Sequence, residues 1–267
     1  MSREDNIEVF RDTMDWCKTS PELSQSIMAS ISGTRLYSPE EILKNSDKRY
    51  SNTEISVSKS RTFDAAFRLH ADYPEMKIGV LNFASAVHPG GGVQKGCTAQ
   101  EESLCRCSTL FPVLDTTYLH KKYYDFNKSQ SNRANTDAVI FTPGIYVVKS
   151  DTSNPERLEA EKWVSVDVLT VAAPDLREIY IDDARLLKLH LSRAKRILGV
   201  AAENGIDILV LGAFGCGAFG NNPYVVAKAY KEVLPEFDGF FKAIEFAIYC
   251  ASYETKNYTA FSETLLK

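Results

Sequence analysis

The stretch from residue 78 to residue 102 constrains the fold more than any other part of the chain. It begins with an apolar, β-branched run over residues 78–83, which has the length of a buried strand. Three consecutive glycines at positions 90–92 follow in a polar loop, and two adjacent carboxylates, Glu101 and Glu102, come next. A strand that opens into a bare-backbone loop and an acid pair indicates an active site.

The glycines matter because a residue without a Cβ atom lets backbone N–H groups crowd against a ligand and takes positive φ without strain. Successive N–H groups then form a concave donor surface that suits an oxyanion or the edge of a sugar. A triple glycine alone is equally compatible with a plain flexible turn. The helix signal that follows it favours the ligand-binding interpretation.

That helix is predicted to begin with a capping box, in which Thr98 is the N-cap residue and Glu101 reaches back to the N-cap N–H. Glu102 would then lie about 100° further around the helix, free to face the glycine loop. An acid in a first helical turn usually serves only to complement the helix dipole. An acid pair directly after a triple glycine favours a catalytic role.

From residue 54 on, predicted strands alternate with predicted helices. The continuous apolar run at 206–211 is typical of a strand covered on both faces, so we expect a mixed, mostly parallel sheet between two helical layers. In such sheets ligands bind beyond the carboxyl ends of the strands, where both glycine loops of this chain fall. The predicted strands are 54–58, 78–83, 137–141, 145–148, 163–173, 206–211 and 244–250; the predicted helices are 62–71, 98–112 ended by Pro112, 187–201 closed by Asn204 and Gly205, and one opened by Asn222 and Pro223.

The chain is predicted to divide into an N-terminal helical extension, residues 1–51, and a catalytic domain, residues 52–267. Apolar residues at helical spacing over 6–18 predict an amphipathic helix. Ser-Pro pairs at 20–21 and 38–39 predict the starts of two more helices. We interpret the extension as a helical cover on the catalytic domain.

A second glycine loop separates the strand 206–211 from the helix opened by Asn222. Its Gly215, Gly217 and Gly220 have the spacing of a dinucleotide-binding fingerprint. The loop does not follow the first strand, however, and no acid ends the next one, which argues against a nicotinamide site. A glycine loop at a helix N-terminus remains well suited to hold a diphosphate.

The two loops carry a resemblance to poly(ADP-ribose) glycohydrolases of the compact microbial type, a branch of the macrodomain family. The triple glycine, seven residues and then Gln100-Glu101-Glu102 are similar to the signature of that family. Residues 80–84 and 211–219 are similar to this branch too. The resemblance covers roughly residues 52–267 and implies a three-layer, macrodomain-like α/β fold.

The resemblance also implies hydrolysis of the ribose–ribose O-glycosidic bond of poly(ADP-ribose), with release of ADP-ribose from chain ends. Cleavage at an anomeric carbon needs a proton for the leaving oxygen, and the catalytic residues implied are Glu102, as general acid and base, and Glu101. Phe219 is implied to pack on the ribose beside the diphosphate. The substrate-binding residues expected are Asn82, Gly90, Gly91, Gly92, Gln100, Gly215, Cys216, Gly217, Ala218 and Phe219.

Two other functions stay open. A module that binds ADP-ribose without hydrolysing it needs both loops but has no use for the acid pair. An enzyme that removes mono-ADP-ribose or acyl groups from ADP-ribosylated targets needs a water that attacks the adduct. The products formed from polymeric and ester-linked substrates distinguish these functions.

We expect no metal and no cofactor. A zinc site is conceivable from Cys97, Cys105, Cys107, His88 and His120, but Cys-x-Cys is not the usual ligand spacing. The six cysteines have no regular spacing and are expected to be free thiols.

Composition narrows the partners and the setting. With 267 residues and a formal net charge of -4, the chain predicts no basic surface that tracks a nucleic-acid backbone. No apolar run approaches the roughly 18 residues of a membrane helix, and the charged start is unlike a signal peptide. We therefore expect a cytoplasmic protein with no membrane partner. The resemblance, rather than the composition, implies ADP-ribose and ADP-ribosylated macromolecules as its partners.

Overall fold

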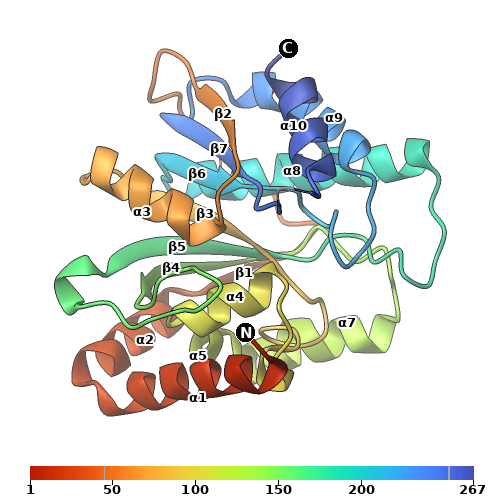
Figure 1. Ribbon diagram of the computed structural model, residues 1–267. Helices are drawn as coiled ribbons and strands as arrows, with labels where there is room; N and C mark the ends of the chain where they lie inside the picture. The colour runs from red at the N-terminus through yellow and green to blue at the C-terminus, as the bar shows by residue number, and fades with distance from the viewer. Residues whose placement is uncertain (45, 252) are drawn as a thin grey trace.

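The computed structural model describes residues 1–44, 46–251 and 253–267. Within these residues a seven-stranded sheet has the order β1-β4-β5-β3-β6-β7-β2 (Figure 1). Strand β4 is antiparallel to β1 and to β5, whereas all the other neighbours are parallel. The sheet is therefore mixed and mostly parallel, as predicted. The strands are β1 (Arg35–Tyr37), β2 (Glu54–Ser58), β3 (Ile78–Phe83), β4 (Val139–Val147), β5 (Val164–Val171), β6 (Ile208–Leu211) and β7 (Ala243–Ala247).

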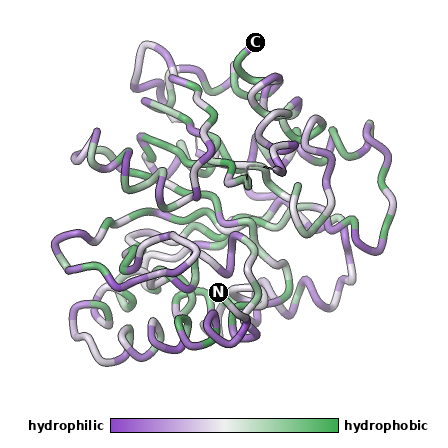
Figure 2. The backbone as a smooth tube through the Cα atoms, viewed as in Figure 1, coloured by the Kyte–Doolittle hydropathy of each residue, from purple (hydrophilic) through white to green (hydrophobic). Residues whose placement is uncertain are grey.

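Helices cover both faces of the sheet and give the fold three layers. Successive residues of a strand point to opposite faces, so Val80 of β3 packs with helices α1 to α5 while Leu81 packs with α8 to α10. Apolar stretches run through the central strands, and hydrophilic ones gather on the outer helices (Figure 2). The helices are α1 (Arg3–Thr19), α2 (Pro21–Gly33), α3 (Thr62–Asp72), α4 (Gln100–Cys107), α5 (Leu110–Leu114), α6 (Thr117–Leu119), α7 (Asp125–Gln130), α8 (Asp183–Glu203), α9 (Pro223–Val233) and α10 (Lys256–Leu265), with short turns of other helix types at η1 (Val93–Lys95), η2 (His120–Tyr124), η3 (Ala160–Lys162) and η4 (Leu234–Phe237).

Several predicted helix ends are confirmed. The side chain of Ser20 caps α2 by accepting the N–H of Leu23, and the side chain of Asn222 caps α9 by accepting the N–H of Tyr224. Helix α8 ends at Asn204, and Gly205 follows with a φ of 70°.

The helix predicted at Ser38-Pro39 was wrong. The segment after β1 makes a turn, and its carbonyl oxygens at Ser38 and Glu41 accept hydrogen bonds from the guanidinium of Arg196 on α8. These bonds tie the segment to α8 after a single turn, in which the Ser38 carbonyl also accepts the N–H of Glu41.

Two other boundaries differ from the prediction. Helix α4 ends at Cys107, because Ser108 forms a bridge with Val147, and Pro112 lies inside the separate helix α5. The strands predicted at 137–141 and 145–148 form one strand, β4, whose register shifts between Thr142 and Ile145. Such a bulge inserts extra residues without ending the strand.

The first fifty residues contribute to the sheet as well as to its cover. Strand β1 pairs with β4 at one edge, α2 packs on β4, and α1 packs on α4 and η1. The division at residue 51 stays a prediction.

The cysteines of the chain are free thiols, as expected. Among the helices that the structure describes, none is both long enough and apolar enough to cross a bilayer.

Candidate active site

A cleft of about 1020 Å³ opens at the carboxyl ends of the parallel strands. Its walls come from the segments that follow β2, β3, β5, β6 and β7, so five connections meet at one edge of the sheet. Both glycine loops contribute, with Gly91 and Gly92 on one side and residues 213–215 and 217–219 on the other. The predicted position of the ligand crevice agrees with this arrangement.

The Glu101 carboxyl group lies between the segment after β3 and the glycine loop, where a Cβ atom on Gly91 would be 3.0 Å from its Oε2. Its Oε2 accepts the N–H of Ser85 at 2.7 Å, and its Oε1 accepts from Nδ2 of Asn82 at 3.3 Å. The predicted capping box was wrong, because α4 begins one residue later with Ala99 as an N-cap that lacks any side-chain hydrogen bond. The carboxylate that was to cap the helix instead joins α4 to the segment after β3.

Glu102 faces the glycine loop, as predicted from the helix geometry. Its Oε1 accepts the N–H of Gly92 at 2.8 Å, and its Oε2 is buried without a hydrogen-bond partner. The φ of Gly91 is 59°, and a Cβ atom at Gly91 would lie 2.6 Å from Oε1 of Glu102. Glycine is therefore required at position 91 both by the backbone conformation and by the approach of the carboxylate.

The two carboxyl groups have different electrostatic surroundings. Burial raises the pKa of Glu101 to about 8; the N–H of Ser85 opposes that rise, and the charge of Glu102 adds to it. The Oδ1 atom of Asn82 is buried without a partner. A half-turn of the Asn82 amide would place this oxygen against Glu101 and give the O–H of a protonated Glu101 an acceptor. The site therefore favours a neutral Glu101 near neutral pH.

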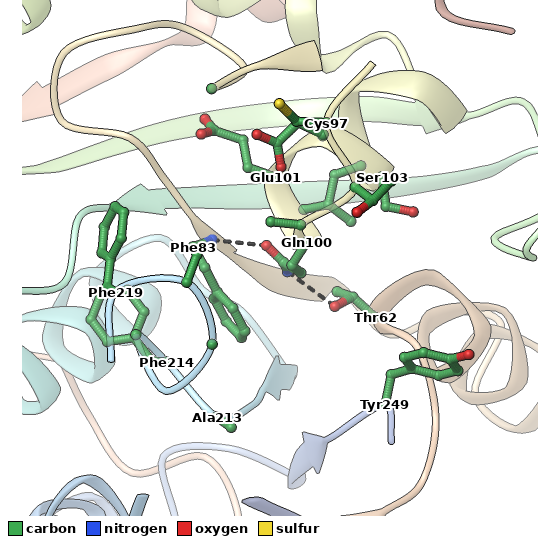
Figure 3. Close-up of a pocket in the computed structure, with 18 of the residues that line it drawn as sticks. Thr62, Phe83, Cys97, Gln100, Glu101, Ser103, Ala213, Phe214, Phe219 and Tyr249 are labelled. Atoms are coloured by element: carbon green, nitrogen blue, oxygen red, sulfur yellow. Dashed lines mark hydrogen bonds between the residues drawn. The ribbon is translucent and has the colours of Figure 1, made fainter. Parts of the chain in front are cut away.

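Gln100 fixes the start of α4 to the sheet. Its Oε1 accepts the N–H of Phe83 at 2.9 Å, and its Nε2 donates to Oγ1 of Thr62 at 3.0 Å (Figure 3). The same Nε2 donates to the carbonyl of Leu81 at 2.8 Å. Gln100 therefore holds the helix that carries the acid pair, and this sets which way each acid points.

Three of the predicted substrate-binding residues do not line the cleft. Asn82 is fully buried and contacts Glu101 and Thr170. Gly90 is buried beneath Phe111, and Cys216 is half-buried with its Sγ 3.6 Å from the carbonyl oxygen of Phe214. Their contact with substrate stays a prediction; in the structure they shape the wall behind the cleft.

The second glycine loop is held by Asn221, a residue that the sequence analysis missed. Its Nδ2 donates to the carbonyls of Pro174 at 2.7 Å and Gly215 at 2.9 Å, and its Oδ1 lies 2.9 Å from Nε2 of His190. Gly215 has a φ of 75°, whereas Gly217 is not in the positive-φ region and has open space around it. Backbone conformation therefore requires glycine at position 215 and not at position 217.

Phe219 lies at the cleft edge of this loop, near Phe214 (Figure 3). The guanidinium of Arg177 is 5.1 Å from the centre of the Phe219 ring. Asp175 holds Arg177 through Nε at 2.8 Å and Nη2 at 2.7 Å. The ion pair of Asp175 and Arg177 thus orients the half-buried ring of Phe219.

Other residues of the cleft carry no motif in the sequence. Arg61 stacks on the ring of Tyr249 at 4.0 Å, and Ser103 donates to Asp151 at 2.9 Å. All four line the cleft. Only their positions near the ends of strands and in the helix after the glycine loop could have indicated them.

The residues considered for zinc do not form a site. Cys105 and Cys107 are buried in the apolar core, and Cys97 is exposed in the cleft. In the residues that the structure describes, no group of three or more His, Cys, Asp or Glu side chains is arranged to hold a metal ion.

Together, a mixed sheet between helical layers and a cleft formed by two glycine loops at its carboxyl edge define a macrodomain-like α/β fold. Residues 13–150, about half of the chain, match the family described as microbial-type PARG, catalytic domain. The chain belongs to the microbial-type poly(ADP-ribose) glycohydrolase family. The resemblance noted in the sequence is thereby confirmed.

Solved structures of this family are similar over nearly the whole chain. Poly(ADP-ribose) glycohydrolase from Thermomonospora curvata is 30% identical, with a TM-score of 0.88 and coverage of 98% of this chain and 99% of that one. The same enzyme bound to the inhibitor ADP-HPD gives a TM-score of 0.86 at 30% identity, covering 97% and 99% of the two chains. The enzyme from Deinococcus radiodurans in complex with ADP-ribose is 33% identical, with a TM-score of 0.78 and coverage of 90% and 96%. A search of curated proteins gives no significant match.

Proposed function

We propose that this chain hydrolyses the ribose–ribose O-glycosidic bond of poly(ADP-ribose). The observation that carries the proposal is the Glu102 carboxyl group, which has one oxygen fixed by the Gly92 N–H and the other without a partner at the wall of the cleft. Family membership supports the same reaction, and related structures hold ADP-ribose or the inhibitor ADP-HPD.

Glu102 acts first as an acid and then as a base. Its free oxygen gives a proton to the leaving ribose oxygen while positive charge develops at the anomeric carbon. The carboxylate left behind then takes a proton from the water that attacks this carbon. The Gly92 N–H holds the carboxyl group in one orientation through both steps, which saves the entropy of aligning it.

Glu101 supports this chemistry from its place beside Glu102 in the cleft lining. It is buried and bound to Ser85 and Asn82, so it reaches the substrate less directly than Glu102 does. We propose that Glu101 fixes the first turn of α4. In its protonated, neutral form it does not repel the carboxylate of Glu102.

The second glycine loop binds the diphosphate, and Phe219 packs on the adjoining ribose. Gly217 and Ala218 are exposed in the cleft, and the loop leads into the N-terminus of α9. Backbone N–H groups at a helix start attract phosphate without a basic side chain.

We further propose that the enzyme works from chain ends, on ADP-ribosylated macromolecules in the cytoplasm. The cleft is bounded by two tight loops, and the sequence provides no long basic groove to track a polymer. The cellular targets and the cytoplasmic setting remain predictions.

Chromatography of early products from defined poly(ADP-ribose) tests the proposal. We expect free ADP-ribose as the dominant early product, with activity retained in EDTA. A burst of mid-length oligomers would show internal cutting. Faster release of mono-ADP-ribose or acyl groups from modified targets would show an adduct-removing enzyme, and tight binding without any turnover would show a binding module.

A further inference from the structure

The first two turns of helix α1 lie against the end of the glycine loop. The Nε atom of Arg3 donates to the carbonyl of Lys95 at 2.5 Å, and Nδ2 of Asn6 donates to the carbonyl of Gly96 at 3.4 Å. Asn6 is only 5% exposed, although asparagine is usually a surface residue. Two side chains of α1 thus donate to the carbonyl groups of Lys95 and Gly96, which follow the three glycines.

The helix backbone touches the loop at Gly96 as well. The φ of Gly96 is 73°, and a Cβ atom there would overlap the carbonyl oxygen of Arg3. The glycine thus permits a backbone approach between two segments that are far apart in the sequence.

An apolar contact reaches the start of the loop. Phe10 of α1 meets Phe111 of α5 edge to face, with 4.9 Å between ring centres. A Cβ atom on Gly90 would lie 2.7 Å from the Phe111 ring, so this ring supports the first of the three glycines. Helix α1 therefore supports both ends of the loop, by hydrogen bonds at one end and through Phe111 at the other.

The same helix also holds α4, which carries Glu102. Oγ1 of Thr13 donates to the carbonyl of Arg106 at 2.6 Å, and Nη1 of Arg106 donates to the carbonyl of Cys97 at 2.5 Å. Thr13 is fully buried and Arg106 is 5% exposed. Helix α1 therefore contacts both the loop that carries Gly92, the donor of the hydrogen bond, and the helix that carries Glu102, its acceptor.

We propose that α1 is a positioning element for catalysis, in which Arg3 and Asn6 keep the Gly92 N–H aligned with the carboxylate of Glu102. These two residues precede residue 13, where the match to the family begins. The inference rests on the proposed role of Glu102. The N-terminal segment then contributes to the reaction as well as covering the catalytic domain.

The double variant Arg3→Ala/Asn6→Ala tests the proposal. Arg3 and Asn6 are near the N-terminus of α1. The buried side chains of Phe10, Thr13 and Cys17 still anchor the helix in the variant, so we expect a folded protein. Because small misplacements of a catalytic group are costly, kcat should fall about tenfold while KM changes less than about twofold. Amide hydrogen exchange at residues 91–97 should become faster, since the loop loses its two side-chain donors.

Trp16→Ala is the matched control on the same helix. Trp16 packs on Trp163 with 5.5 Å between ring centres and lies 4.4 Å from the guanidinium of Arg157, away from the loop. We expect a lower melting temperature with kcat and loop exchange unchanged. An equal loss of kcat in the control and in the double variant would reduce α1 to a stabilising element and overturn the proposal.

Gly96→Ala tests the same contact from the loop side. The added Cβ should separate the loop from α1 and reproduce the loss in kcat. If this variant fails to fold, the double variant still decides the matter. A parent protein that does not hydrolyse polymer would refute the proposed function, and hydrogen exchange would then still test the helix–loop contact. Parent-like kcat and parent-like exchange in the double variant would refute the positioning role alone.

Discussion

The two glycine loops line the same cleft and both contain glycines with positive φ, but they differ in what approaches the loop backbone. In the loop after β3, a carboxylate occupies the space where a side chain of Gly91 would be. In the loop after β6, Gly215 provides a positive φ, and the space around Gly217 is open. The first loop therefore holds a reacting group in place, whereas the second leaves its backbone free to meet a ligand.

The loops also differ in what lies behind them. The loop after β3 is supported by α1, α4 and Phe111, and Glu101 and Glu102 accept hydrogen bonds from the N–H groups of Ser85 and Gly92. In the loop after β6, the carbonyls of Gly215 and Phe219 accept hydrogen bonds from Asn221 and from the N–H of Leu176, and Arg177 contacts the ring of Phe219. Substitutions in the first loop should therefore change turnover most, and substitutions in the second should change affinity most.

Glu102→Gln should have the largest effect. The amide keeps the shape of the acid but cannot transfer its proton, so kcat should fall by roughly a thousandfold. The dissociation constant for ADP-ribose should stay within about tenfold of the parent value. A variant that retains more than a few per cent of parent turnover would show that another group is the acid.

Gly91→Ala should come next. Its Cβ would displace the Glu102 carboxylate in a backbone conformation that alanine tolerates poorly, so kcat should fall by about a hundredfold. Steady-state kinetics at a temperature well below the melting transition measures this loss. If the variant loses affinity for ADP-ribose and keeps its kcat, the distinction between the two loops is wrong.

Gly217→Val should weaken ADP-ribose binding by about tenfold or more, the scale of one lost hydrogen bond to a charged group. The open space around Gly217 accepts the side chain, which then covers the backbone N–H groups. Calorimetric titration measures the affinity, and the melting temperature should stay within about 2 °C. Gly215→Ala is the contrasting control: its positive φ and the methyl of Ala173 at 2.5 Å from the new Cβ should lower the melting temperature.

Glu101→Gln should have the smallest effect and should change only how stability depends on pH. The folded-state pKa of about 8 lies above the ordinary value of 4.5. A raised pKa means that the folded state binds the proton more tightly, so this contribution is full below pH 4.5 and is lost as pH rises through 8. Denaturant unfolding across this range should show a shallower decline in the variant than in the parent. Parallel profiles would mean that Glu101 is ionised in the folded protein at neutral pH.

Most of the fold could be predicted from local patterns. The apolar run before the glycines and the capped starts of α2 and α9 depend on nearby residues, and the structure has them where expected. The helix predicted after Ser38 failed because a distant arginine, Arg196, binds its carbonyls. A contact between residues so far apart has no signature in either segment.

The candidate site shows the same limit. The side to which Glu102 points followed from helical geometry, whereas the position of Glu101 depends on Asn82 and Ser85, which are brought to it by the sheet. The roles of Arg177, Asn221 and helix α1 arise only from tertiary packing. Residue spacing therefore predicts the group that faces the substrate better than the groups that hold it.

The link between Gln100 and β3 determines which changes in length the site tolerates during evolution. The register of α4 is set by the bonds of Gln100 to Phe83 and Leu81, not by the number of residues in the preceding loop. An insertion or deletion between the triple glycine and Gln100 leaves both acids in place. One inserted residue after Gln100 would move Glu101 to the position that Glu102 now holds and turn Glu102 about 100° further around the helix, so we expect length variation among relatives before Gln100 and none within Gln100-Glu101-Glu102.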